Sequence, residues 1–333
     1  MKTNLLTSVI ISALIVAVPF SASKKRKIPQ TEFHPIKEAE KAEKPEIAEA
    51  ESADAETYVS VLVDDDIRVM DMAQYLIGVV AAEMPANFEY EALKAQAVAA
   101  RTYTMYRSSV MPTDNHPEAD VCNDPACCKA YADVDTLRTG WGDKYDENLE
   151  KIRNAVISTD GIFIAYEDEP ILAAFHSSSS EYTASSQEVW GGELPYLVSV
   201  DSPENSDNVP GFISEVAISP DDFAETVLTY YPEADFSGTP ESWIGDAEYS
   251  QSGRLLNIEL GGVDVKGTEL RSMFALRSAA LSVECDENIV ITAHGYGHGV
   301  GMSQYGANVM ALDGCGFEDI LAHYYPNTVL KQI

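Results

Sequence analysis

The apolar positions near residue 72 predict two consecutive helices. The run MAQYLIGVVAAE, from Met72 to Glu83, is apolar enough for a buried helix, and Asp71 is placed to cap its start. Pro85 ends it, because the residue before a proline avoids the α region. A second helix is expected from about Glu89, through EYEALKAQAVAARTYTMYRSS, whose alanine-rich face permits close helix approach.

Short β-type runs begin the folded region and dominate the later chain. YVSVLV near Tyr58 is the first, and GIFIAY, PILAAFHS, ISEVAI, LLNIELGG and NIVITAH follow. A hairpin is expected from Ile162 to Phe175, turning through EDEP. A helix near Phe317–Tyr324 and a strand at TVLKQI close the chain. The pattern predicts an α+β fold, with a helical part packed against a strand-rich part and a cleft between them.

The amino-terminal segment is distinct from this domain. No charge lies between Lys2 and Lys24, and as a helix this run would measure about 31 Å, enough to cross a bilayer core of about 30 Å. Residues 1–23 are therefore interpreted as a signal-anchor or transmembrane segment, and small residues at 21–23 leave cleavage by a signal peptidase as the alternative. Either way the rest would be exported, although the basic residues 24–27 after the run oppose the positive-inside rule.

Residues 24–56 are rich in Lys, Glu, Ala and Pro, with almost no large apolar residues. Such a segment cannot bury enough surface to fold alone, so we interpret it as a disordered tether with a reach on the order of 30 Å. The catalytic domain is then expected over residues 57–333.

Charge excludes one class of partner. The chain has 54 Asp and Glu against 22 Lys and Arg, a net charge of −32. This surface would repel phosphate backbones, so nucleic acid is not expected to bind. A neutral polysaccharide or a basic protein remains compatible.

Glu83 is the most informative acidic residue. It ends an apolar helix, where helix carbonyls and apolar neighbours both favour a protonated carboxyl group. This suits a general acid for glycosidic cleavage. On position alone, a solvated helix-end glutamate is the alternative.

Long motifs resemble the stage II sporulation protein D (SpoIID) family of lytic transglycosylases. They run in family order: GVVAAEMP with EALKAQAVAARTYTMY, FHSSSSEYTASSQEVWGGELPYLVSVDSPE, GHGVGMSQYGA and HYYPNTVLKQI. The resemblance implies that Glu83 is the single acid/base and that Lys94 and Arg101 hold Glu83 or the sugar chain. It also implies substrate contacts at His176, Ser177, His298, Gln304 and Tyr305.

The implied reaction cleaves the bond between N-acetylmuramic acid and N-acetylglucosamine and leaves a 1,6-anhydro product. A water-using glycosidase normally needs a second carboxyl group, for which Glu181 and Glu188 are the candidates. The family usually has glycine where Ser180 and Glu181 stand, which would strain this loop if either needed a positive φ. No GxSxG elbow surrounds the serine run at residues 177–180, so a serine hydrolase is not expected. The glycine-rich loop HGYGHGVG does not fit a dinucleotide-binding loop.

A cysteine cluster predicts a metal site. His116, Cys122, Cys127 and Cys128 are four soft ligands within thirteen positions, enough to surround one tetrahedral Zn²⁺. Some family members carry zinc here, often with histidine at the position of Cys127, and we expect the zinc to be structural. A disulfide or free thiols are the alternative. Cys285 and Cys315 are a second possible pair.

The resemblance also implies a biological setting. The enzyme would be anchored in the mother-cell membrane, with its catalytic domain facing the septal wall during forespore engulfment. It would act on peptide-stripped glycan strands, with a wall amidase and a membrane scaffold protein as partners. Two rivals are a non-catalytic wall protein that enhances an amidase and a zinc hydrolase built on the cysteine cluster.

Overall fold

The folded chain begins earlier than residue 57. The computed structural model describes residues 52–333, which form one unit, and a short helix α1 (Ala53–Glu56) already belongs to it. The carboxylate of Asp160 accepts the backbone N–H groups of Ala53 at 2.9 Å and Asp54 at 3.0 Å, and Asp54 is itself buried. Residues 52–56 of the expected tether are thus part of the fold.

The rest of the expected tether and the expected membrane segment lie outside the described residues. Within residues 52–333, no helix is both long enough and apolar enough to cross a bilayer.

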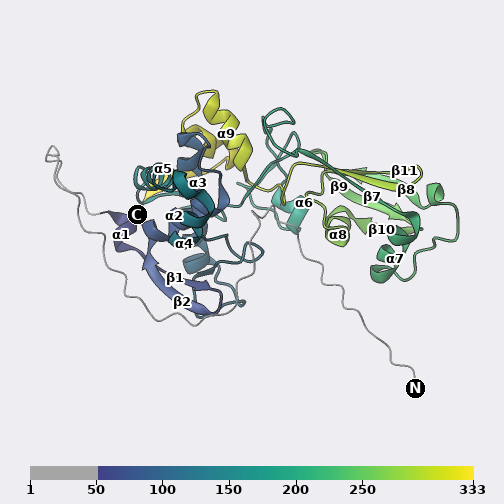
Figure 1. Ribbon diagram of the computed structural model, residues 1–333, viewed down its shortest axis with the longest axis horizontal. Helices are drawn as coiled ribbons and strands as arrows, with labels where there is room; N and C mark the ends of the chain where they lie inside the picture. The colour runs from purple at the N-terminus through teal and green to yellow at the C-terminus, as the bar shows by residue number, and fades with distance from the viewer. Residues whose placement is uncertain (1–51) are drawn as a thin grey trace, which may run out of the picture. The chain divides into compact units, whose positions relative to one another are not determined.

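The first part of the described chain is mainly helical (Figure 1). Its elements after α1 are β1 (Tyr58–Val63), β2 (Asp66–Asp71), α2 (Met72–Glu83), α3 (Tyr90–Met105), the π-helical turn η1 (Tyr106–Val110), β3 (Val121–Cys122), α4 (Val134–Trp141), the 3₁₀ turn η2 (Gly142–Lys144), α5 (Tyr145–Ile157), β4 (Ile162–Tyr166), β5 (Glu169–Pro170), β6 (Phe175–His176) and α6 (Ser186–Trp190).

The two predicted helices are confirmed. The Asp71 side chain caps α2 by accepting the Gln74 N–H at 2.7 Å, and α2 ends at Glu83, ahead of Pro85. Helix α3 is buried along most of its length and lies against α2, α5, α9, α10 and β4. Its alanine-rich surface explains how so many elements approach it, since an alanine side chain adds little thickness at a contact.

The predicted hairpin after Ile162 is shorter than expected. Strands β4 and β5 pair at only two positions, across a turn in which Glu167 and Asp168 have φ of 49° and 73°. Two successive positive φ values fit a tight hairpin turn. Residues 171–174 then leave the sheet, and the longer partner of β4 is the carboxy-terminal strand β14 (Val329–Gln332).

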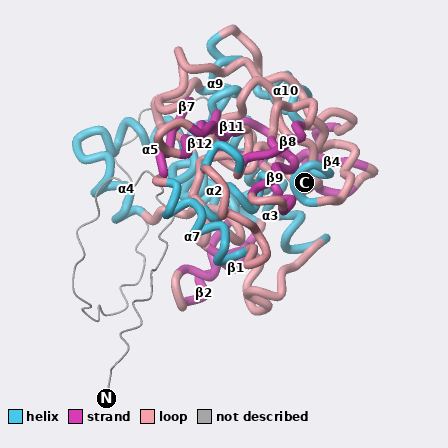
Figure 2. The backbone as a smooth tube through the Cα atoms, turned by 90° about the vertical axis from the view of Figure 1, so that its right-hand side faces the viewer, coloured by secondary structure: helices cyan, strands magenta, loops and turns pink. Residues whose placement is uncertain are grey.

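A second hydrophobic cluster is formed by a later stretch of chain. Its elements are β7 (Ile213–Ile218), α7 (Pro220–Tyr230), the 3₁₀ turn η3 (Pro240–Ser242), β8 (Ile244–Tyr249), β9 (Leu255–Leu260), β10 (Val263–Lys266), α8 (Gly267–Met273), β11 (Leu281–Cys285) and β12 (Ile289–His294). They make two antiparallel sheets, of order β10-β9-β8 and β11-β12-β7. Figure 2 shows β7, β11 and β12 side by side.

After this stretch the chain returns to the first cluster. Strand β13 (Met302–Ser303) pairs in parallel with β6, while α9 (Gln304–Leu312) and α10 (Phe317–Tyr324) pack on α3. Residues 213–294 are therefore an insertion between β6 and β13. The mixed α+β class is confirmed, and the cleft between the two parts stays a prediction.

Candidate functional site

Glu83 is held from two sides at the end of α2. Its Oε1 accepts the backbone N–H of Ala130 at 2.9 Å, and its Oε2 accepts from Nε2 of Gln304 at 3.4 Å. The carboxyl group is half-buried, so part of it stays open to a ligand. The fold thus brings together Glu83 and Gln304, both expected from sequence, across a separation of 221 residues.

Lys129 is a charged neighbour of Glu83 that sequence reasoning missed. Its Nζ lies 3.6 Å from the ring centroid of Phe175 and 4.3 Å from that of Tyr103. Burial lowers the pKa of Lys129 to about 8, and the negative charge of Glu83 opposes this shift. The sequence signal was weak, since Lys129 is marked only by its place after Cys128.

His176 is neutral and anchors the serine loop, residues 177–180. Its Nδ1 lies 3.2 Å from the carbonyl oxygen of Val300, and its Nε2 lies 2.7 Å from Oγ of Ser179. Burial, helped by the charge of Arg254, lowers the pKa of His176 to about 3. A carbonyl can only accept, so Nδ1–H donates to Val300 and Nε2 accepts from Ser179. The next residue, Ser177, accepts the Tyr305 N–H with its carbonyl at 3.0 Å.

The glycine-rich loop packs against this serine loop. Gly295 has φ of 72°, and a β-carbon there would lie 2.5 Å from the carbonyl oxygen of Ser178. Glycine at this position therefore lets the backbone of the serine loop come close. The ring of His298 lies 5.7 Å from that of His176 and 5.5 Å from that of the exposed Trp190.

Tyr305 follows Gln304 in α9, and its ring packs edge-on against Phe88 with centroids 4.9 Å apart. The fold thus links His176, Ser177, His298, Gln304 and Tyr305 in one network that reaches Glu83 through Gln304.

Glu204 organises this network and was also missed as a site residue. Its buried carboxylate accepts the Ser179 N–H at 2.6 Å, the Ser202 hydroxyl at 2.6 Å and the Ser303 hydroxyl. One carboxylate thereby fixes the serine loop to the residue before Gln304. The only signal in the sequence was its position at the end of the motif VSVDSPE.

Lys94 and Arg101 have no described contact with Glu83. Lys94 pairs with Glu91 at 3.0 Å and lies 4.3 Å from the ring centroid of Phe317. Arg101 is fully buried, and Asp54 accepts from its Nε at 2.7 Å and its Nη2 at 2.5 Å. Its Nη1 donates to the carbonyl of Ile162 at 2.9 Å, so no face of the guanidinium is left for a sugar chain.

The two candidate second carboxylates are also away from Glu83 in the contacts described. Glu188 caps α6 by accepting the Ser185 N–H at 2.8 Å. Glu181 is exposed and, like Ser180, has no positive φ, so the loop carries no backbone strain at these positions.

The four expected metal ligands converge. The ligand atoms of His116, Cys122, Cys127 and Cys128 all lie within 4.8 Å of one another. Nδ1 of His116 is 2.9 Å from the carbonyl of Ala119, which fixes the proton on Nδ1 and leaves Nε2 free for a metal. These residues fit a tetrahedral zinc site with sulfur and nitrogen ligands.

The cysteines are all free thiols within residues 52–333, including Cys285 and Cys315. Burial raises the pKa of Cys122 to about 12 and also raises that of Cys128. Because thiolates are the ligands, metal binding here would release protons.

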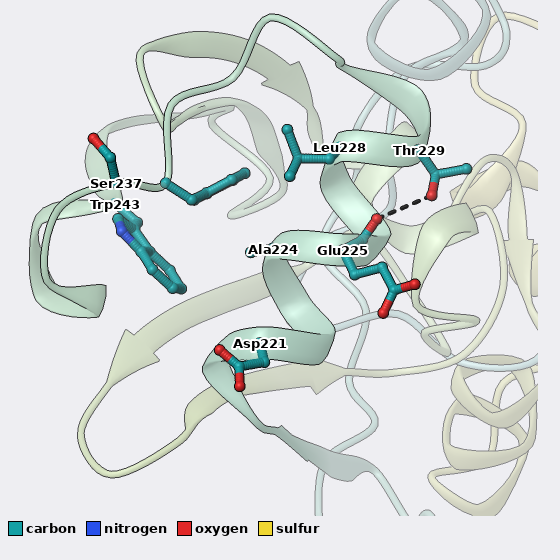
Figure 3. Close-up of a pocket in the computed structure, with 8 residues that line it drawn as sticks. Asp221, Ala224, Glu225, Leu228, Thr229, Ser237 and Trp243 are labelled. Carbon is teal, nitrogen blue, oxygen red and sulfur yellow. Dashed lines mark hydrogen bonds between the residues drawn. The ribbon is translucent and has the colours of Figure 1, made fainter.

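A pocket of about 660 Å³ lies in the second cluster, beside α7 (Figure 3). Leu228 and Ala224 from the helix and Trp243 from the facing segment are among the residues that line it, and none of the candidate site residues does.

Comparison with known proteins agrees with these motifs. A family model described as "SpoIID: Stage II sporulation protein" matches residues 63–166. Stage II sporulation protein D of Bacillus amyloliquefaciens is 34% identical over 345 positions, covering 99% of this chain and 94% of the relative. The protein of the same name from Bacillus subtilis strain 168 is 33% identical, covering 81% of this chain and 77% of the relative.

A more distant relative, the amidase enhancer of Bacillus subtilis strain 168, is 28% identical, covering 77% of this chain and 40% of the relative. The coverage and identity of the first two relatives, together with the family model over α2, α3 and the cysteine cluster, establish that this chain belongs to the stage II sporulation protein D family.

Proposed function

We propose that this chain is a peptidoglycan lytic transglycosylase that cleaves MurNAc–GlcNAc bonds of peptide-stripped glycan strands, with Glu83 as its one acid/base. The observation that carries the proposal is the setting of Glu83: a half-buried carboxyl group, oriented by Ala130 and Gln304, with no second carboxylate in contact with it among residues 52–333. A reaction that closes an internal ring needs only one such group, whereas hydrolysis needs two.

In the proposed reaction Glu83 gives up one proton and takes one back. Its carboxyl group gives a proton to the glycosidic oxygen as the C1–O bond breaks. The resulting carboxylate takes the proton of the muramic C6 hydroxyl, whose oxygen bonds to C1 and forms the 1,6-anhydro ring. Glu83 ends protonated, ready for the next bond. The N–H of Ala130 and the amide of Gln304 would keep the carboxyl group oriented through both transfers.

The remaining site residues would hold the glycan. Ser177, His298 and Tyr305, with the exposed ring of Trp190 beside His298, are the proposed contacts. Neutral His176 and the carboxylate of Glu204 would act through the loops that they fix.

The cysteine cluster would hold a structural Zn²⁺ through His116, Cys122, Cys127 and Cys128. When bound, zinc would cross-link the loop of residues 116–128. The N–H of Ala130, two residues further on, donates to Glu83. Four protein ligands leave no open position for a water, which argues against the zinc-hydrolase alternative.

Membership of the family indicates a role in sporulation. Within that role we propose degradation of septal wall during forespore engulfment, by a domain on the extracytoplasmic side of the mother-cell membrane, together with a wall amidase and a membrane scaffold protein. Similarity to a relative named amidase enhancer favours a second candidate, a non-catalytic wall-binding protein that stimulates an amidase.

Digestion of peptide-stripped glycan, analysed by mass spectrometry, separates these proposals. The wild-type chain should release products ending in 1,6-anhydromuramic acid, Glu83→Gln should release none, and the control Glu181→Gln, at an exposed acid, should retain activity. Reducing-end products heavier by one water would refute the transglycosylase. Absence of any cleavage, with amidase stimulation unchanged in Glu83→Gln, would favour the second candidate.

A further inference from the structure

Arg254 is a buried cation without a partner among residues 52–333. Its side chain and backbone together are 5% exposed, and its guanidinium takes part in none of the ion pairs or hydrogen bonds of this part of the chain. Burying a charge costs a large free energy unless a counter-charge compensates it. An unpaired buried arginine is conspicuous in a chain with 54 acidic residues, because counter-charges are abundant.

The acidic residue whose charge acts on Arg254 already has other hydrogen-bond partners. Glu188 is the one carboxylate that raises the pKa of Arg254, while burial and the charge of Arg271 lower it to about 10. The carboxylate of Glu188 accepts the Ser185 N–H at 2.8 Å and lies 3.3 Å from the Ser252 hydroxyl. It caps α6 and makes no ion pair with Arg254 within the described residues.

The guanidinium of Arg254 lies against the candidate glycan site. A β-carbon built on Gly299 would collide with Nη1 and lie 3.0 Å from Cζ. Gly299 stands between His298 and Val300, the residues that contact Trp190 and His176. Glycine at this position therefore lets the cation approach the backbone of the proposed substrate-binding loop.

A second guanidinium reinforces the positive charge. Arg271 is largely buried, and its Nε donates to the carbonyl of Leu276 at 3.2 Å. Both arginines contribute to the lowered pKa of His176 and of His298, so their charges act on this one place. The fold thus keeps a concentrated positive charge beside the candidate site of an acidic protein.

We propose that Arg254, supported by Arg271, binds the free lactyl carboxylate of a muramic acid residue in the strand. This rests on the proposed function, and it names what selects the substrate. A guanidinium pairs with a carboxylate through two parallel hydrogen bonds. In a strand that still carries stem peptides, the same carbon belongs to a neutral amide. A site built on Arg254 would therefore favour strands from which an amidase has already removed the peptides.

The test changes the substrate before it changes the protein. Full-length Glu83→Gln chain, which binds without cleaving, is titrated with three glycan preparations: peptide-stripped strands with free carboxyl groups, the same strands with these groups converted to primary amides, and peptide-bearing strands. Wild-type cleavage rates are measured on the same three. We expect amidation to weaken binding about ten- to a hundredfold, the range for losing a charged hydrogen bond.

Arg254→Gln in the same background should bind the free-carboxyl strand as weakly as the amidated one. Its affinity for the amidated strand should equal that of the parent chain. Arg254→Lys, which keeps the charge without the two-pronged geometry, should fall between. Arg153→Gln, at an exposed arginine on α5, is the matched control and should preserve the difference.

Equal binding of free and amidated strands by the parent chain would overturn the inference, even if Arg254→Gln does not fold. Equally tight binding of peptide-bearing strands would also overturn it, because the anion would then come from the stem peptide. Either result leaves the proposed function standing if anhydro products still form. The proposed function fails separately, if no preparation is cleaved.

Discussion

Asp54 and Arg101 form a buried ion pair whose removal should be costly. Both side chains are almost fully buried, at 1% and 0% exposure, and two hydrogen bonds of 2.7 Å and 2.5 Å join them. Asp54→Ala would leave the guanidinium in the core with only the carbonyl of Ile162 as partner. Breaking one side of a buried pair costs about 3–5 kcal/mol, a large share of a typical stability of about 5–15 kcal/mol.

Urea unfolding of residues 52–333, followed by tryptophan fluorescence, measures this loss. Asp65→Ala, at an exposed acid in the β1–β2 turn, is the control and should change the free energy of unfolding by about 0.5 kcal/mol or less. The double variant Asp54→Ala with Arg101→Met should lose less than the sum of the single variants, because it removes the unpaired charge.

The same contact predicts that the domain boundary matters. A chain truncated to residues 57–333, the limit expected from sequence, lacks Asp54 and should be destabilised about as much as Asp54→Ala. An Asp54→Ala variant as stable as Asp65→Ala would refute the reasoning, since it would mean that the pair contributes nothing to the folded state.

Three further predictions concern the site. The pKa of His176 is 6.5 in the unfolded chain and about 3 in the folded one, so between these pH values the unfolded state binds more protons and the free energy of unfolding should rise by about 1.4 kcal/mol per pH unit. His176→Gln should reduce the pH dependence of the urea midpoint by this slope, and an unchanged slope would contradict the burial argument. Glu204→Gln would place an amide where a carboxylate accepts three hydrogen bonds, and calorimetry should show a loss of about 2–3 kcal/mol; a loss no larger than for a surface residue would count against its organising role. Zinc added to metal-free chain should raise the melting temperature and release protons, and Cys128→Ser should remove most of the effect; a response that survives this substitution would place the metal elsewhere.

Local chemistry determined the parts of this protein that could be predicted from sequence. The bounds of α2 follow from Asp71 and Pro85, both within two residues of the helix ends, and α10 was expected at Phe317–Tyr324, where it lies. The four metal ligands converge because they are close in sequence. Long motifs also identified the family, since they preserve residue order over most of the chain.

Tertiary structure decided which charges are available and which are used. Lys94 and Arg101 are seven residues apart on one helix. Lys94 is partly buried and pairs with Glu91, whereas Arg101 is fully buried and pairs with Asp54, from a segment expected to be unfolded. Glu83 contacts Gln304 because the chain returns after residues 213–294 and pairs β13 with β6, directly before Gln304. Periodicity and capping signals act over a few residues, whereas burial, ion pairing and the isolation of Arg254 depend on segments far apart in the chain. Such contacts exist only once the whole core has formed.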